Sequence, residues 1–353
     1  MCRNFRHYFD TIALQLMNIE VTENLRQPPY PRALALLQAA PRPESNPTFP
    51  IHATHCTALM KRIALKIDVN THQGALTGVP ALLALFDRYQ ASGTFFFSFG
   101  PDRGFQAQTT LLRNCLRSIR LHGHGPQGAD ISKDCGHILR ETLAAGFEIG
   151  VGAWNQAAWE KNIGTADAAW ITTSMQRAQA EFTALVGERP AAIAAPGWRS
   201  SRRALRLTQR LDYAYASDCR GSHPFIPIVE GEIIACPQLP TTLPTLDEIL
   251  VIDPTLSPEQ AAERILQLSK VIPGDHVCTL RAEIEGDYFA DACEYLLRGW
   301  QTAGISPIAL RDLYISLDLE ALPRHAVVFD EIPGRPGKRM IQGDLFPAPL
   351  PPT

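Results

Sequence analysis

One stretch of the sequence, RIALKIDVNT (residues 62–71), constrains the fold more than any other. Apolar residues occupy every second position in it, which is the periodicity of a β-strand with one buried face. The opposite face carries Lys66, Asp68 and Asn70. A core barrel strand that places an acid at its carboxyl end commonly contributes to an active site there. We therefore expect a site at Asp68. The next residue on the same face of the strand, Asn70, carries a neutral amide instead of a second acid.

Strand-like and helix-like segments alternate between residues 60 and 318. Their order predicts one α/β domain built on a parallel sheet, either as a barrel or as a doubly wound sheet. Further strands are expected at residues 94–99, 147–151, 191–195, 214–217, 233–235 and 276–280. Helices are expected at residues 78–90, 130–145, 166–186, 203–211 and 287–302, and from the N-cap Ser257 onwards.

The two flanking segments lack this regularity. Residues 1–59 include a Pro-rich stretch that is typical of a linker or a disordered extension. Met60 opens directly onto the first strand, so it is a candidate for the biological start, and a genuine extension is the alternative. Residues 319–353 are Pro-rich and lack core periodicity. We expect this tail to wrap the surface of a domain that spans residues 60–318.

Composition excludes several classes of function. The formal net charge of the 353-residue chain is −3, so no strong positive field favours nucleic acid. The eight cysteines are scattered, without the spacing of a metal site or a disulfide framework, which favours a reducing, cytoplasmic compartment. No apolar run approaches the roughly 20 residues that a transmembrane helix needs.

Four segments carry a resemblance to a known family: KIDVNT (66–71), GVGAWNQAAWE (150–160), AAPGWRSS (194–201) and TLRAEIEG (279–286). In order and spacing they resemble the polysaccharide deacetylase (NodB-homology) family. Within it they are most similar to the deformylases that act on 4-deoxy-4-formamido-L-arabinose-phosphoundecaprenol. The resemblance covers roughly Met60 to Gly343. It implies a single-domain, distorted (β/α) barrel with its site at the carboxyl ends of the strands.

The resemblance also implies a reaction. Family members hydrolyse the N-formyl or N-acetyl group of an amino sugar with one divalent metal ion, typically zinc, held by an Asp and two His. The metal polarises the carbonyl group and lowers the pKa of a bound water. A second Asp accepts the proton of that water, and a His protonates the leaving amine. A sugar linked to undecaprenyl phosphate would place the protein at the inner face of the membrane, in lipid A modification.

Most residues at the positions assigned to this chemistry are replaced. Asp68 falls on the family's base and is kept, whereas Arg281 falls on the proton-donating His and does not release a proton near neutral pH. Residues that bind metal weakly or not at all stand at the three ligand positions: Asn70, Gly152 and Gln156. We therefore expect no metal cofactor. Without a metal, a buried Asp68 needs a cationic partner, and Arg281 or Arg199 is expected to supply it.

The resemblance further implies a set of residues that contact or organise the substrate: Trp198, Arg199, Asp218, Arg220 and Glu283. Other residues offer a relocated site. His72 shares strand parity with Asp68, and His122 and His124 lie in an irregular segment. We expect all three histidines to be loop residues, because histidines in Gly-rich loops are more often solvated than bound to metal.

Three hypotheses follow from these replacements. The leading one is a metal-free, inactive pseudoenzyme that binds an amino-sugar ligand or regulates an active paralogue. The second is an active amide hydrolase with a rearranged site. The third is a purely structural or interaction protein that has lost the pocket as well.

Overall fold

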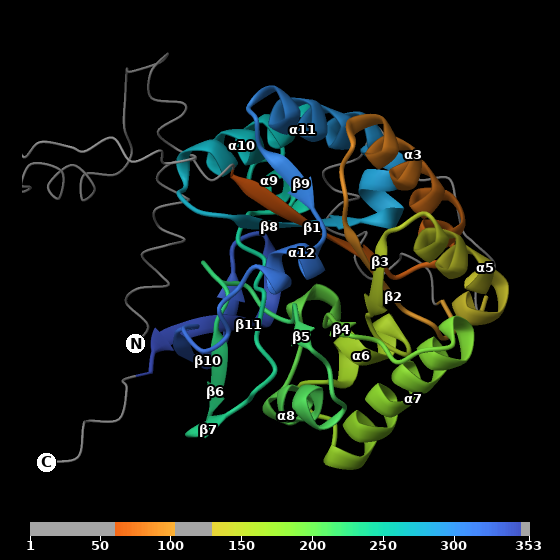
Figure 1. The fold of residues 1–353 in the computed structure, drawn as a ribbon, viewed down its shortest axis with the longest axis vertical. Coiled ribbons are helices and arrows are strands. Elements are labelled where there is room, and N and C mark those ends of the chain that lie inside the picture. Colours follow the sequence, from red (N-terminus) through yellow and green to blue (C-terminus); the bar gives the residue numbers. More distant parts are fainter. Residues whose placement is uncertain (1–60, 103–128, 347–353) are drawn as a thin grey trace, which may run out of the picture.

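The structure is a computed structural model, and it describes residues 61–102 and 129–346. The expectations for Met60, His122 and His124 lie outside these residues. Seven strands form one parallel sheet in the order β5-β4-β3-β2-β1-β8, with β9 beside β1 (Figure 1). These strands are β1 (Arg62–Val69), β2 (Thr94–Phe97), β3 (Glu148–Val151), β4 (Ala192–Ile193), β5 (Tyr215–Ala216), β8 (His276–Arg281) and β9 (Ser306–Ile308).

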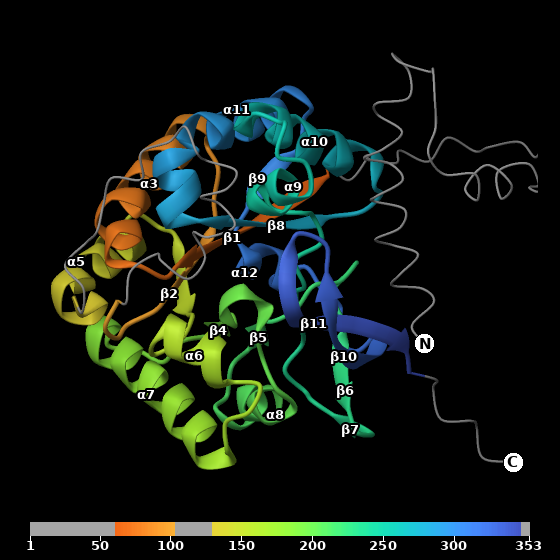
Figure 2. The ribbon, with the colours of Figure 1, turned by 180° about the vertical axis from the view of Figure 1, so that it is seen from behind.

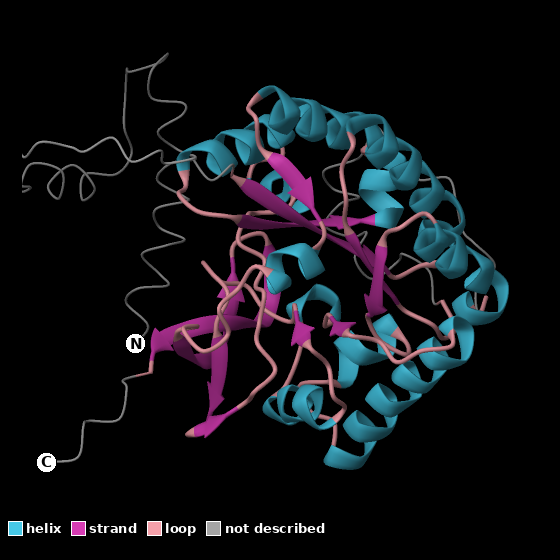
Figure 3. Ribbon diagram, viewed as in Figure 1, coloured by secondary structure: helices cyan, strands magenta, loops and turns pink. Residues whose placement is uncertain are grey.

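Most of the helices lie around the outside of the curved sheet, as the cyan ribbons of Figure 3 show, whereas α12 packs on its inner side. They are α3 (Val79–Tyr89), α5 (Ile131–Ala144), α6 (Gln156–Asn162), α7 (Ala168–Val186), α8 (Arg202–Arg210), α9 (Leu246–Ile252), α10 (Pro258–Val271), α11 (Ala290–Thr302) and α12 (Leu310–Ile315). Three short turns of helix, η1 (Gly74–Gly78), η3 (Pro196–Trp198) and η4 (Ile284–Tyr288), follow strand ends. In the described part of the chain, every helix is too short or too polar to span a membrane.

The alternation read in β1 is confirmed. Its apolar side chains Ile63, Leu65, Ile67 and Val69 are all buried in the layer between sheet and helices. The opposite face begins with Ala64, which packs in a separate cluster inside the barrel with residues of α12, including Leu310. Lys66 and Asp68 continue this inner face toward the carboxyl end of the strand. Burial of both faces explains why the sheet can be parallel throughout.

The tail differs from the expectation. Its described part contains β10 (Arg324–Ile332) and β11 (Arg335–Leu345), an antiparallel hairpin in which Met340 and Ile341 are buried. The hairpin joins β6 (Ile226–Val229) and β7 (Glu232–Ile233) in a second sheet of order β11-β10-β6-β7 beside the barrel (Figure 2). The expected surface wrap is therefore wrong for residues 324–345, because pairing with β6 and with one another satisfies their backbone groups.

Candidate functional site

Asp68 lies at the carboxyl end of β1 and forms an ion pair with Lys66. The Lys66 Nζ atom is 2.9 Å from Asp68 Oδ1 and 3.2 Å from Oδ2. The lysine side chain has no exposed surface, and Asp68 is 5 % exposed. The two residues lie together because side chains two positions apart on a strand share a face. That parity was present in the sequence and could have pointed to this pair, although we named two arginines instead.

We expected Arg281 or Arg199 as the partner of Asp68, but the ion pair that the structure gives Asp68 is with Lys66. Arg281 lies level with Asp68 on the neighbouring strand β8, but its Nη2 atom pairs with Asp247 at 3.0 Å. The Nη1 atom of Arg199 donates to the backbone carbonyl of Glu160 at 2.8 Å. Lys66 lies two positions before Asp68 on the same face of β1, so its side chain meets the carboxylate.

The three positions that fall on the family's metal ligands have other contacts. The amide oxygen of buried Asn70 accepts a hydrogen bond from Ser98 Oγ at 3.1 Å. Gln156 opens α6 and its Nε2 atom donates to Glu160 Oε1 at 2.6 Å. A Cβ atom built at Gly152 would lie 3.2 Å from the Phe97 carbonyl oxygen and 3.4 Å from Ser98 Oγ. A side chain at Gly152 would thus require its neighbours to shift.

These donors do not fit the family's metal ion. Two neutral amides and a glycine stand at the positions to which the resemblance assigns a carboxylate and two imidazoles. Within residues 61–102 and 129–346, no group of three or more His, Cys, Asp or Glu side chains is placed to share a metal. His72 lies outside the site, but it is in the first helical turn after β1 and not in a loop, so that expectation is wrong. Its Nε2 atom is 3.5 Å from Asp134 and its backbone N–H donates to Asp102.

A buried ion-pair network joins β8 to the C-terminal hairpin. Asp247 Oδ1 forms an ion pair with Arg281 Nη2 at 3.0 Å and accepts a hydrogen bond from Arg335 Nη2 at 2.9 Å. Arg335 Nε also donates to Glu248 Oε1 at 2.8 Å. Arg220 lies 3.4 Å from Glu248. Burial acts to raise the pKa of Asp247, but the two guanidinium groups hold it below its usual value. The sequence analysis did not include Asp247, Glu248 or Arg335, since no local pattern connects residues so far apart.

Trp198 stands between these cations. Its ring centroid is 4.8 Å from the guanidinium carbons of Arg220 and Arg335 and 5.6 Å from Lys66 Nζ. Its indole N–H donates to Thr241 Oγ1 at 3.1 Å. The ring is 1 % exposed, so it packs under the network and does not offer a face to solvent. Cations over an aromatic face gain electrostatic energy, and this arrangement supports the crowded positive charges.

Two buried glutamates follow β8. Burial raises the pKa of Glu283 to about 8 and that of Glu285 to about 7. Arg281 opposes the rise in both groups, while the charge of Asp68 adds to it in Glu283. Glu283 Oε2 and Glu285 Oε1 have no hydrogen-bond partner in the structure. Glu283 therefore holds its proton at neutral pH, one strand away from Asp68.

We expect Glu283 to make stability fall as pH rises. A carboxyl group whose folded-state pKa is raised contributes stability below its usual pKa, and this is lost as the pH rises through about 8. Urea unfolding measures the drop in the free energy of unfolding between pH 5 and pH 8.5. This drop should be smaller in Glu283→Gln than in the wild type, by on the order of 2 kcal/mol. The exposed Glu188→Gln is the matched control. An unchanged pH dependence in Glu283→Gln would contradict the assignment.

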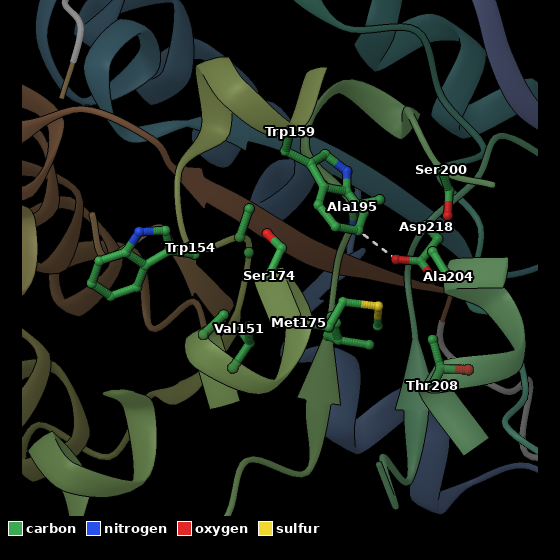
Figure 4. Close-up of a pocket in the computed structure, with 14 residues that line it drawn as sticks. Val151, Trp154, Trp159, Ser174, Met175, Ala195, Ser200, Ala204, Thr208 and Asp218 are labelled. Atoms are coloured by element: carbon green, nitrogen blue, oxygen red, sulfur yellow. Dashed lines mark hydrogen bonds between the residues drawn. The ribbon is translucent and has the colours of Figure 1, made fainter. Parts of the chain in front are cut away.

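Asp218 lies beside a small cavity between β3, β4 and α7 (Figure 4). Its Oδ1 atom accepts the backbone N–H of Ala195 at 2.7 Å, and burial raises its pKa to about 6. Apolar side chains dominate the lining, among them Trp159 and Met175, and the space holds about one water molecule. Asp218 thus anchors the end of β4, and the cavity as it stands is too small for a sugar.

Comparison with known proteins adds relatives that match most of the chain. No protein-family model matches it. A protein of Shewanella sediminis (strain HAW-EB3) is 32 % identical over 290 residues, which cover 78 % of this chain and 93 % of the relative. A protein of Wigglesworthia glossinidia brevipalpis is 29 % identical over 283 residues, covering 75 % and 96 %. Both carry the name "Probable 4-deoxy-4-formamido-L-arabinose-phosphoundecaprenol deformylase ArnD".

Solved structures share the fold. The crystal structure of a "putative polysaccharide deacetylase" from Mycobacterium smegmatis has a TM-score of 0.54 at 16 % identity, and covers 82 % of this chain and 100 % of its own. Puue allantoinase matches with a TM-score of 0.54 at 16 % identity, covering 77 % and 93 %. The expected single-domain, barrel-like α/β fold is confirmed. With the identity and coverage of its relatives, the chain therefore belongs to the polysaccharide deacetylase family, in the group of the 4-deoxy-4-formamido-L-arabinose-phosphoundecaprenol deformylases.

Proposed function

We propose that this chain is a metal-free member of its family that retains the scaffold but does not carry out metal-dependent hydrolysis. The observation that carries the proposal is the donor set: Asn70, Gly152 and Gln156 stand at the ligand positions. Neutral amides bring no charge to a divalent cation, and glycine brings no donor atom. The two amides are also already hydrogen-bonded to Ser98 and Glu160.

The acid and base positions support the same proposal. Asp68 is paired with a buried ammonium group, so its charge is already balanced within the protein. A second cation placed beside it would be repelled by Lys66 in a site where charges are poorly screened. Arg281, which stands at the position of the general acid, pairs with Asp247 and does not donate its proton near neutral pH.

The ligand we propose is a formamido- or acetamido-sugar carried on undecaprenyl phosphate, the substrate for which the curated relatives are named. This places the protein at the cytoplasmic face of the membrane. Arg199, which follows Trp198 after β4, is the cationic side chain we assign to recognition of such a ligand. Arg220 is buried against Trp198 and Glu248, and we assign it a positioning role.

Formate release from a formamido-sugar undecaprenyl phosphate, with and without Zn²⁺, tests the proposal. The wild type is expected to show no turnover. A variant that combines Asn70→Asp, Gly152→His, Gln156→His and Arg281→His is expected to bind Zn²⁺ at this site and to gain turnover if its crowded Gly152 position relaxes. Wild-type turnover that Asp68→Ala abolishes would overturn the proposal.

One observation favours a second candidate, an amide hydrolase with a rearranged site. Glu283 is protonated at neutral pH and lies near ion-paired Asp68, and two carboxyl groups in different protonation states can serve as acid and base. This candidate predicts metal-independent turnover that Glu283→Gln abolishes. Turnover that is absent in the wild type, with and without metal, would exclude it.

A further inference from the structure

Two arginines from different elements meet over Gly337, at the edge of the candidate site. Arg199 follows η3, and Arg339 lies on β11 of the C-terminal hairpin. A Cβ atom built at Gly337 would lie 3.1 Å from Arg199 Nη2 and 3.6 Å from Arg339 Nη1. Trp198 of η3 packs with Ile341 of β11, which keeps the two elements together. Two guanidinium groups therefore converge on one point of the protein.

Backbone carbonyl groups fix the position of both side chains. Arg199 Nη1 donates to the carbonyl oxygen of Glu160 at 2.8 Å. Arg339 Nη1 donates to the carbonyl oxygens of Gly337 and Lys338 at 3.1 and 3.2 Å. A carbonyl oxygen carries no formal charge, so these hydrogen bonds orient the guanidinium groups without balancing them. The arginine pair is thus a positioned unit with two positive charges.

The Nε–H groups of this pair are unpaired in the described residues. Arg339 is only 6 % exposed, and neither its Nε atom nor that of Arg199 has a hydrogen-bond partner there. The buried ion pairs beside them, among residues 61–102 and 129–346, are made by other arginines. Burying a charged group without a counter-ion is costly. The pair therefore indicates an anionic partner that comes from outside the described chain.

The carboxylates near the pair are bound to other groups. Glu160 Oε1 accepts a hydrogen bond from the side-chain amide of Gln156 at 2.6 Å. Asp247 and Glu248 form ion pairs with Arg335. The attraction of these acids is shared with those partners, so it only partly offsets the charge of the arginine pair.

The register of the hairpin places one more acid beside Arg339. Asp330 lies opposite it on β10, but the Asp330 side chain is exposed and its Oδ1 atom accepts the backbone N–H of Glu331 at 2.9 Å. Burial and the charges of Arg199 and Arg335 lower the pKa of Arg339 to about 10. The group is thus still cationic at neutral pH, at an electrostatic cost that a bound anion would reduce.

We propose that Arg199 and Arg339 form a subsite for a phosphoryl group. A guanidinium group presents paired N–H donors in one plane, which match two oxygens of a phosphate. A phosphate at this place would balance the two like charges and offer acceptors to the unpaired N–H groups. Arg199 is half-buried, so an anion can reach the pair from solvent. The source, which rests on the proposed function, is the phosphate of the lipid-linked sugar, and a free phosphate offers the same oxygens.

Binding of two phosphate probes to the full chain tests the subsite. The probes are inorganic phosphate and phosphatidylcholine nanodiscs that contain undecaprenyl phosphate, with plain phosphatidylcholine nanodiscs as the blank. Arg339→Met is expected to weaken binding by about 10- to 100-fold, the loss of a charge-assisted hydrogen-bonded contact. Arg339→Lys keeps the charge but not the planar fork, so its loss should be smaller. The matched control is Arg140→Met, which removes an exposed arginine on α5 and should leave binding unchanged.

Two further measurements separate a lost subsite from a lost fold. Ligand-free Arg339→Met should unfold at about the same urea concentration as the wild type, because its carbonyl contacts lie within its own strand. In the wild type, which needs no substitution, either probe should shift the ¹⁵Nε–H resonances of Arg199 and Arg339 and leave that of Arg140 in place. A response to inorganic phosphate alone supports the subsite with a water-soluble ligand, whereas nanodisc binding that depends on Arg339 supports the lipid.

The subsite is overturned if Arg339→Met binds each probe as tightly as the wild type, or if neither probe binds or shifts the two resonances. Formate release decides the proposed function separately. Turnover by a wild type that binds phosphate through Arg339 would overturn the metal-free proposal and leave the subsite in place. Loss of the subsite without any turnover would leave the metal-free proposal in place.

Discussion

Lys66→Met is expected to lower the free energy of unfolding by about 3–5 kcal/mol. The substitution leaves the Asp68 carboxylate buried without its cation, since Lys66 Nζ is 2.9 Å from Asp68 Oδ1 and the lysine has no exposed surface. Removing one partner of a buried ion pair costs the desolvation of the remaining charge, which the lost attraction no longer offsets. Urea denaturation at pH 7 with linear extrapolation measures the loss.

Two controls separate this effect from loss of packing. The double variant Lys66→Met with Asp68→Asn removes both charges and should recover most of the stability. Arg88→Ala breaks an ion pair of similar length, 3.0 Å to Glu294, but with side chains 63 % and 33 % exposed, and it should cost no more than about 1 kcal/mol. If Lys66→Met costs no more than Arg88→Ala, Asp68 is not held by this lysine.

The regular elements were largely predictable from local patterns. The capping box at Ser257 is present as expected, with Ser257 and Gln260 each bonded to the other's backbone, and α10 begins at Pro258. The helix expected at residues 166–186 is α7, Ala168–Val186. Strands at the far edge were less exact: residues 191–195 contain only Ala192–Ile193 as strand. Apolar runs indicate burial, whereas strand ends depend on the neighbouring chain.

The C-terminal hairpin was not predictable in this way. β10 is half-exposed, and β11 is interrupted by glycines and charged residues, so neither carries a clear alternating pattern. Their pairing with β6 joins segments far apart in the sequence. Such contacts are decided by tertiary structure, which a local pattern does not contain. Pro333, one of the prolines that suggested a loose tail, lies in the turn between the two strands.

For the site, the sequence suggested which residues are replaced but not their new partners. The replacements we assign to Asn70, Gly152 and Gln156 rest on spacing and family resemblance. The pair between Arg281 and Asp247 is not, because charge logic favoured Asp68, the nearer residue across the sheet. Strand parity could have identified the partner of Asp68, because Lys66 lies two positions away on the same face of the strand. It was a better guide than the comparison of Arg281 with Arg199.

Arg335→Ala is expected to cost about 3–5 kcal/mol and to loosen the hairpin that carries it. Arg335 donates to Asp247 at 2.9 Å and to Glu248 at 2.8 Å, and its side chain is only 12 % exposed. Without it, Arg281 is the cation that the structure still places against Asp247 within the described residues. Urea unfolding measures the loss, and hydrogen exchange should show lower protection in β10 and β11 than in the wild type.

The charge and the geometry of Arg335 can be separated. Arg335→Lys keeps the charge but cannot direct two N–H groups at two carboxylates, so we expect an intermediate loss of stability. The pKa of Asp247 is lowered in the folded state, so its contribution to stability is present above its usual pKa and is lost as the pH falls through the folded value. That acid-side loss should shrink in Arg335→Ala. Full stability in Arg335→Ala would mean that Arg281 alone balances Asp247 and that the hairpin is held by its pairing with β6.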